Sequence, residues 1–289
     1  MKKVMVYINR SSFIKSDIDI LKCSEYKFTP SIKGFIKQFF YFLTHRYDQY
    51  YIFFCDLHGL IPVLFSRLHG KSTILVGGYD AVRIDDYGIF DGGVRSKIIK
   101  LIYKLAHDVI ISSGDELKER LNRHIKTDAE VIYPGIDTSF FTPAKGIKRD
   151  IDYITTAGAT NEKIFYRKGL NRFINMAESN PDKKFVIINC SILINKNNIE
   201  VTGRVSDLEL KKYYNRSKYY CQLSRYESFG ISLIEAMSMG CMPIVSDVGM
   251  MKIIAGNVTT REEARNRAVN NYSLKIRINK LNNYEKNSD

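Results

Sequence analysis

Residues 225–247 read RYESFGISLIEAMSMGCMPIVSD, and this stretch decides how the second half of the chain folds. Apolar side chains recur at helical spacing from Ile231 to Met239, whereas the Ser-Phe-Gly before them is a poor choice for a helix interior. A helix is therefore predicted to begin near Gly230 and to end at Gly240. The apolar run that follows predicts a buried strand.

Two carboxylates, Glu227 and Glu235, stand on either side of this junction between loop and helix. The first turn of a helix presents free backbone N–H groups and the positive end of the helix dipole, so it can bind an anion. Gly230 would let a ligand approach the main chain closely. Because carboxylates accept hydrogen bonds from hydroxyl groups, a phosphate with a polyol on each side fits this pattern. A nucleotide sugar is such a ligand.

The Glu-x7-Glu pattern in this context resembles the retaining glycosyltransferases of family four, which have the GT-B fold. Three further stretches resemble the family in the family's own order. They are residues 108–143 at the end of the first domain, 168–188 at the start of the second, and 203–214 beside the nucleotide base. The resemblance extends over about residues 51–256, and the Glu-x7-Glu block is its most specific part.

The resemblance implies a role for each matching residue. Glu227 would hold the donor sugar and Glu235 the ribose. Lys168 occupies the family's lysine position on the diphosphate, and Arg167 is expected to replace the family's arginine, because Ala159 stands at that position. The remaining residues expected around the donor are Val205, Ser228, Phe229, Gly230 and Ile231.

The sequence departs from the family in the first half as well. A family histidine would fall at Gly77, so Asp80, or its neighbour Tyr79, is expected to act on the acceptor side. Asp80 is therefore counted with Glu227 and Lys168 as catalytic, although it could instead cap the following turn. No pair of acidic residues and no histidine spacing suggests a metal site, so no metal and no cofactor are expected.

The rest of the chain alternates short apolar runs with helical stretches, which predicts an α/β fold. Two doubly wound Rossmann-like domains are expected to face each other across a cleft, with a C-terminal domain shorter than is usual in the family. The acceptor-side domain is assigned to residues 1–144 plus 272–289, and the nucleotide-sugar-binding domain to residues 145–271. The expected strands lie in residues 4–8, 51–55, 73–76, 109–112 and 131–133, and then in 153–156, 185–189, 200–202, 219–223 and 242–246.

The composition indicates a folded protein with acidic partners. The chain has 289 residues and a net charge of +13, which favours nucleotides, anionic lipid or nucleic acid. Its five cysteines are odd in number and widely spaced, which indicates reduced, buried thiols and a cytoplasmic protein. No motif typical of nucleic-acid recognition is present, so nucleic acid is not expected as a partner.

Residues 30–51 interleave lysines with phenylalanines and other large apolar side chains. Such a segment can lie on an anionic membrane surface, which would make the protein peripheral to the membrane. It can also be a helix that packs on the core with solvated lysines, which is the commoner case.

The function expected from these observations is retaining, metal-independent transfer of a sugar from a nucleoside-diphosphate sugar to an acceptor hydroxyl. The acceptor would be a glycan, a glycolipid or a protein glycan. The departures at Gly77 and Ala159 leave an alternative open. In that alternative, the chain is a non-catalytic module that binds nucleotide sugars or glycans.

Overall fold

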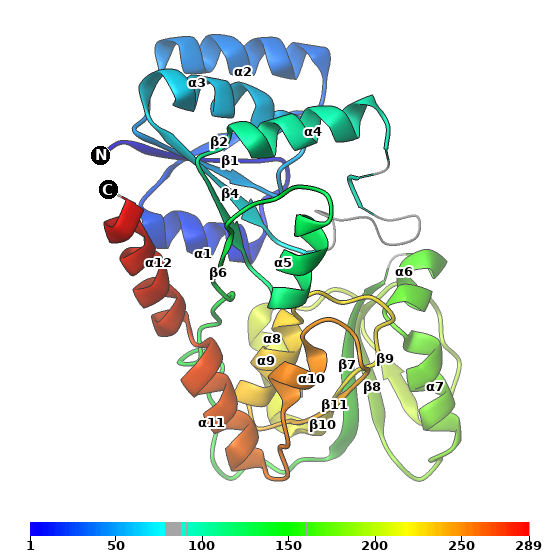
Figure 1. The fold of residues 1–289 in the computed structure, drawn as a ribbon. Coiled ribbons are helices and arrows are strands. Elements are labelled where there is room, and N and C mark those ends of the chain that lie inside the picture. Colours follow the sequence, from blue (N-terminus) through cyan, green and yellow to red (C-terminus); the bar gives the residue numbers. More distant parts are fainter. Residues whose placement is uncertain (79–87, 91, 160, 289) are drawn as a thin grey trace. The chain divides into compact units, whose positions relative to one another are not determined.

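The structure is a computed structural model that describes residues 1–78, 88–90, 92–159 and 161–288. The chain divides into two compact units, Met1–Pro134 with Ile278–Asp289 and Gly135–Arg277 (Figure 1). Each unit is built on one parallel sheet with helices on both faces, as the sequence predicts.

The sheet of the first unit has the strand order β2-β1-β3-β4-β5-β6, and every neighbouring pair of strands is parallel. Its central strands are almost completely buried, as expected for a sheet that is covered on both faces. The strands are β1 (Lys3–Tyr7), β2 (Ser24–Lys27), β3 (Gln49–Phe53), β4 (Lys71–Val76), β5 (Asp108–Ile111) and β6 (Glu130–Val131).

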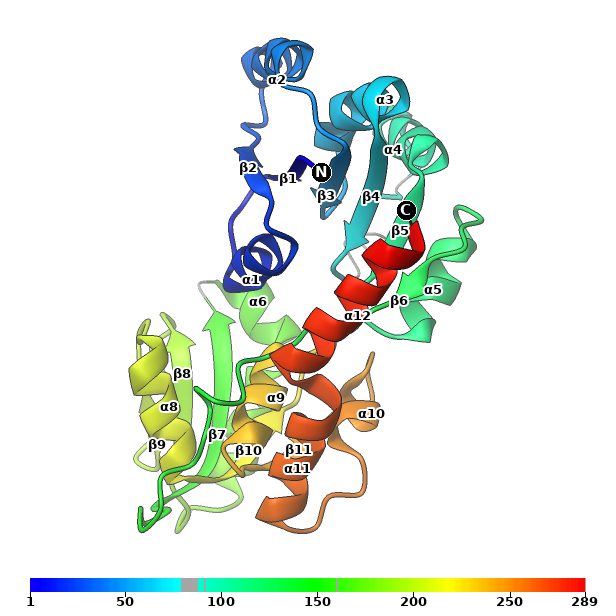
Figure 2. The same ribbon diagram turned by 90° about the vertical axis from the view of Figure 1, so that its left-hand side faces the viewer.

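Helices cover the two faces of this sheet with separate apolar clusters (Figures 1 and 2). One face packs against α2 (Ile32–Thr44), the short η1 (Leu57–Gly59), α3 (Leu60–His69), α4 (Val94–Leu105) and α5 (Asp115–Asn122). The other face packs against α1 (Ser12–Leu21) and the end of α12 (Leu274–Ser288). Leu281 and Tyr284 of α12 are buried there, so this late segment completes a core that begins at Met5.

The sheet of the second unit has the order β11-β10-β7-β8-β9, and it too is parallel throughout. Its strands are β7 (Ile151–Ala159), β8 (Phe185–Cys190), β9 (Ile199–Val201), β10 (Ser217–Gln222) and β11 (Met242–Val245). Its helices are α6 (Glu162–Arg167), α7 (Leu170–Glu178), α8 (Asp207–Arg216), α9 (Ile231–Ser238), α10 (Met251–Ala255) and α11 (Arg261–Tyr272), followed by the start of α12.

All ten strands expected from the sequence are present, and one further strand, β2, was missed. The sequence of β2 is SEYK and only one of its four side chains is buried, so it lacks the apolar run that marks a strand. The boundary between the units also falls earlier than expected. Phe141 belongs to the second unit, where its carbonyl accepts hydrogen bonds from Ser238 and Arg265.

Among the described residues, no helix is both long enough and apolar enough to cross a membrane. The five cysteines are free thiols; four are buried and Cys23 is partly buried.

Leu281→Ala is expected to lower the free energy of unfolding by about 2 to 5 kcal/mol, because it empties a fully buried site in the core beneath α12. Urea unfolding followed by circular dichroism measures the change. Leu193→Ala, at a leucine that is 93% exposed, is the matched control and should change the stability little. Equal effects of the two substitutions would show that α12 does not pack on the first unit.

Candidate functional site

The loop between β10 and α9 carries most of the expected donor-binding residues. Glycines allow neighbouring segments to pack closely against it. A Cβ at Gly169 would lie 1.9 Å from the carbonyl oxygen of Leu223, and one at Gly249 would lie 2.0 Å from that of Glu227. Both glycines have positive φ angles, as does Gly230, which precedes α9. The neighbouring segments can therefore approach the loop this closely only because side chains are absent. The helix begins and ends where the sequence predicts.

Glu227 and Lys168 form an ion pair at the edge of the sheet. Lys168 Nζ lies 2.7 Å from Glu227 Oε2, and the two side chains are only 26% and 16% exposed. Gln222 also donates to Glu227 Oε2, at 3.2 Å. Gln222 in turn accepts from the buried Tyr220 hydroxyl, which contacts Thr156 Oγ1 at 2.6 Å. Polar side chains from β7 and β10 thus hold the carboxylate of Glu227.

Glu235 lies two turns into α9 and has a different environment. Its side chain is partly buried between Ile234 and Ala236, which are fully buried. Burial raises the pKa of Glu235 to about 7, and the negative charge of Asp207 adds to the effect. Within the part of the chain that the structure describes, no side chain pairs with this carboxylate. Glu235 is therefore available to a ligand.

The charges of Glu227 and Glu235 both affect the pKa of Tyr220. Burial is the main cause of the raised pKa of Tyr220, and both carboxylates raise it further through their charge. Tyr220 is completely buried in β10. Both carboxylates are therefore near enough to Tyr220 to act on it through their charge.

Val205 lies in the loop between β9 and α8, and its backbone N–H donates to Asn189 Oδ1 at 2.9 Å. Asn189 has a left-handed backbone near the end of β8. Val205 and Glu227 lie in loops that follow the parallel strands β9 and β10. Lys168 lies between α6 and α7, and its Nζ contacts Glu227. Since ligands of open α/β sheets bind beyond the carboxyl ends of the strands, these loops define the candidate donor site.

The expected role of Arg167 as a second cation stays a prediction. Its backbone carbonyl accepts from the Arg225 N–H at 2.8 Å. Arg225 was not among the expected site residues, yet it fixes this corner of the site. Its guanidinium donates to the Tyr166 carbonyl and to Asn171 Oδ1, and it lies 3.5 Å from the centre of the Tyr166 ring. No signal in the sequence distinguishes Arg225 from a solvated arginine.

Ser228, Phe229 and Ile231 complete the loop. Phe229 is buried and its ring packs edge-on against Tyr272, 5.8 Å away. The Ser228 carbonyl accepts from Met250 N–H at 3.3 Å. Phe229 therefore contributes packing through its side chain.

Asp80 and Tyr79 lie outside the described residues, so their expected role on the acceptor side stays a prediction. The structure does explain the nearby Gly77. A Cβ at Gly77 would fall 1.4 Å from the ring of Phe54, so this ring fills the space that a side chain at position 77 would need. Phe54 has a positive φ and is 40% exposed. A histidine at position 77 would require Phe54 to move.

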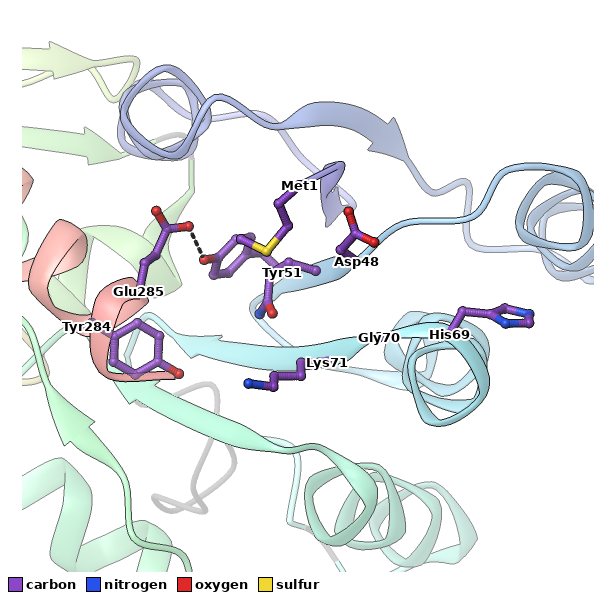
Figure 3. A pocket seen from close by; sticks show the side chains of 9 residues that line it. Met1, Asp48, Tyr51, His69, Gly70, Lys71, Tyr284 and Glu285 are labelled. Atoms are coloured by element: carbon purple, nitrogen blue, oxygen red, sulfur yellow. Dashed lines mark hydrogen bonds between the residues drawn. The ribbon is translucent and has the colours of Figure 1, made fainter. Parts of the chain in front are cut away.

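A separate pocket of about 240 Å³ lies inside the first unit (Figure 3). It is at the amino ends of β3 and β4, where Gln49 and Lys71 begin these strands. Its best-placed acid, Glu285, already accepts from the Tyr51 hydroxyl at 2.8 Å and pairs with Lys3. These contacts anchor α12, and they indicate a structural role for the pocket.

Comparison with known proteins shows a likeness to glycosyltransferases. Residues 161–283 match the family model described as "Glycosyl transferases group 1". The protein named "Putative glycosyltransferase 41" of Sulfolobus islandicus filamentous virus is 34% identical over 110 residues, which are 36% of this chain and 33% of the relative. The match thus spans about a third of that relative's length.

Two solved structures resemble the whole chain. Sucrose-phosphate synthase from Thermosynechococcus elongatus has a TM-score of 0.76 at 12% identity, over 99% of both chains. The lipopolysaccharide outer core galactosyltransferase WaaB has a TM-score of 0.70 at 12% identity, over 100% of both chains. The chain has the GT-B fold, and residues 161–283 resemble the group 1 glycosyl transferases.

Glu235→Gln is expected to stabilise the protein more at pH 8 than at pH 5. A glutamate in an unfolded chain has a pKa near about 4.3, whereas burial raises that of Glu235 to about 7. Between these two pKa values the carboxyl group is ionised in the unfolded state but still protonated in the folded state. The free energy of unfolding therefore falls as pH rises. Glutamine does not ionise, so the variant does not lose stability in this way. A tenfold difference in proton affinity is worth about 1.4 kcal/mol. Solvent screening at the partly exposed Glu235 side chain lowers this contribution, so the variant should gain about 1 to 3 kcal/mol in the free energy of unfolding at pH 8.

Urea unfolding at both pH values measures this difference. Glu262→Gln, at an exposed carboxylate of the same unit, is the control and should change the stability equally at pH 5 and pH 8. If Glu235→Gln behaves like this control, the carboxylate of Glu235 is not desolvated in the folded protein.

Proposed function

We propose that this chain transfers a sugar from a nucleoside-diphosphate sugar to an acceptor hydroxyl, with retention of the anomeric configuration. The observation that carries the proposal is the arrangement of Glu227, Lys168 and Glu235. One carboxylate is paired with a lysine, and the other has no partner among the described residues. Both lie near the start of α9, which Gly230 precedes in a left-handed conformation. A ligand with a diphosphate between two polyols matches these groups.

In the proposed complex, the diphosphate takes over part of the contact that Lys168 makes with Glu227. The ammonium group then stabilises the negative charge that develops on the leaving phosphate, together with the backbone N–H groups at the start of α9. Arg167 is proposed as a second cation. Glu235 accepts hydrogen bonds from the ribose.

Glu227 is proposed to orient the donor sugar through its hydroxyl groups. The bond between the anomeric carbon and the phosphate oxygen breaks, and the acceptor oxygen forms the new bond on the same face of the sugar. The proton of the acceptor hydroxyl goes to the departing phosphate. This scheme requires no metal, because Lys168 and the helix terminus supply the positive charge.

The acceptor is proposed to be a glycan or a lipid-linked glycan, and the site of action the cytoplasm. WaaB, one of the solved proteins with this fold, is a lipopolysaccharide galactosyltransferase, which supports an acceptor of this kind. The second candidate is a non-catalytic module that binds nucleotide sugars, and the Phe54 ring in the place of a side chain at position 77 favours it. Release of free sugar from the donor by the purified protein distinguishes an enzyme from such a module.

Lys168→Ala is expected to weaken binding of a nucleoside diphosphate about 10- to 100-fold and to leave binding of the bare nucleoside unchanged. A charge-assisted hydrogen bond to phosphate is worth about 1.5 to 3 kcal/mol, and only a ligand with phosphate can lose it. Glu235→Ala should weaken both ligands, because both contain the ribose. Isothermal titration with a panel of nucleosides and diphosphates measures these affinities.

Two variants test the assignment further. Glu178→Ala, at an exposed surface carboxylate of the same unit, is the control and should leave all affinities unchanged. Arg167→Ala should weaken diphosphate binding less than Lys168→Ala. If Lys168→Ala weakens the nucleoside and the diphosphate equally, the diphosphate is bound elsewhere.

Glycosyl transfer is expected to persist in EDTA, because the proposed cations are side chains of the protein. Turnover of the donor that binds best, with and without the chelator, is the measurement. Loss of activity in EDTA that Mn²⁺ or Mg²⁺ restores would contradict the metal-independent scheme.

A further inference from the structure

The three helices α2, α3 and α4 contain no acidic residue. Their sequences are IKGFIKQFFYFLT, LIPVLFSRLH and VRSKIIKLIYKL, whereas the whole chain has 31 Asp and Glu in 289 residues. The helices are neighbours in one layer on one face of the first sheet (Figure 1). Phe39 of α2 meets Phe65 of α3 with ring centres 5.7 Å apart, and Arg67 of α3 donates to the Leu105 carbonyl of α4 at 2.7 Å.

Helix α2 has two stripes of side chains, and the larger apolar one is exposed. The buried stripe contains Gly34, Gln38 and Phe42, one of which is polar. The exposed stripe recurs at intervals of three or four residues, and between 46% and 83% of each residue is accessible. Its members are Ile32, Ile36, Phe39, Phe40 and Leu43. A helix that only packs on a core shows the opposite distribution.

The neighbouring helices continue this surface. On α3, Leu64 and Leu68 are exposed one turn apart. On α4, the exposed stripe alternates between apolar and basic side chains: Val94, Lys97, Leu101 and Lys104. We call the exposed side of these three helices the α2–α4 face. Monomeric proteins rarely expose an apolar area of this extent without using it for an interaction.

The α2–α4 face also carries lysines that pair with no acid among the described residues. Lys33 and Lys37 lie beside the apolar residues of α2, and Lys97 and Lys104 lie on α4. None of these four lysines forms an ion pair within the described part of the chain. A partner of the face must therefore combine an apolar layer with negative charge.

We propose that the α2–α4 face docks on an anionic lipid bilayer, with its apolar side chains between the acyl chains and its lysines at the headgroups. A second copy of this chain would bring like charges together, which disfavours self-association through the face. Nucleic acid would satisfy the lysines and leave the five large apolar side chains of α2 in water. A bilayer satisfies both kinds of side chain, as amphipathic helices that lie in the interface do.

Co-sedimentation of the full chain with vesicles tests the proposal. The chain is expected to bind vesicles of phosphatidylcholine mixed with phosphatidylglycerol, to bind phosphatidylcholine alone at least tenfold less, and to dissociate as salt is raised. Lys33→Gln with Lys37→Gln should lower the partition coefficient about 25-fold, because each lysine near an anionic surface contributes about fivefold. Phe40→Ser with Leu43→Ser should lower it at least tenfold through the loss of buried apolar area.

Matched controls lie on the second unit. Ile147→Ser with Leu193→Ser removes exposed apolar side chains, and Lys145→Gln with Lys148→Gln removes exposed lysines from the linker region. Both controls should bind vesicles like the wild type. Because all the substituted residues are exposed, the thermal midpoints of every variant should stay close to that of the wild type, which excludes unfolding as the cause of lost binding.

Three outcomes would overturn the proposal. The first is no binding to either kind of vesicle. The second is equal loss of binding in the variants of the α2–α4 face and in the controls. The third is sedimentation equilibrium that shows a dimer in the wild type and a monomer in the Phe40→Ser, Leu43→Ser variant, which would assign the face to self-association. None of these experiments uses a sugar donor, so their outcome is independent of the proposed glycosyl transfer.

Discussion

The candidate site depends on the close approach of backbone segments to the loop between β10 and α9, which carries Glu227. Gly169 and Gly249 each approach a carbonyl oxygen of this loop so closely that any side chain at either position would clash with it. Between them the loop has little freedom, and the Glu227 carboxylate is held further by Lys168 and Gln222. A site that binds a charged, flexible ligand benefits from such rigidity, because less entropy is lost when the ligand binds.

Glu235 illustrates the cost of such a site. A carboxylate that is partly buried without a counter-charge destabilises the folded protein when it ionises. The raised pKa of Glu235 reflects this unfavourable free energy of ionisation. A ligand with hydroxyl groups can offset it by donating hydrogen bonds to the carboxylate. Lys168 and Glu227 avoid the same cost by pairing with each other. The two carboxylates of one motif are therefore stabilised in different ways, and this difference follows from their positions in the loop and in the helix.

The sequence predicts the sheets and the motif well, because both depend on local patterns. Apolar runs identify the buried strands, and the glycines at 230 and 240 mark the ends of α9. The polar strand β2 escapes this reasoning, since an edge strand needs few apolar side chains. The contact of the Phe54 ring with Gly77 and the contacts of Arg225 could not be predicted from local sequence patterns either. They join residues whose proximity depends on the tertiary fold.

The return of α12 to the first unit has a consequence for how the chain folds as it is synthesised. Lys3 and Glu285 pair across almost the entire sequence, and the core around Met5 is closed by Leu281 and Tyr284. Helix α1 covers part of one face of the first sheet early, but this face cannot be covered completely until the second unit and α12 have been made. During synthesis the part of this face that α12 later covers stays open to water, and a ribosome-associated chaperone that covers it would prevent aggregation. The second unit, whose residues are continuous in sequence, has no such delay.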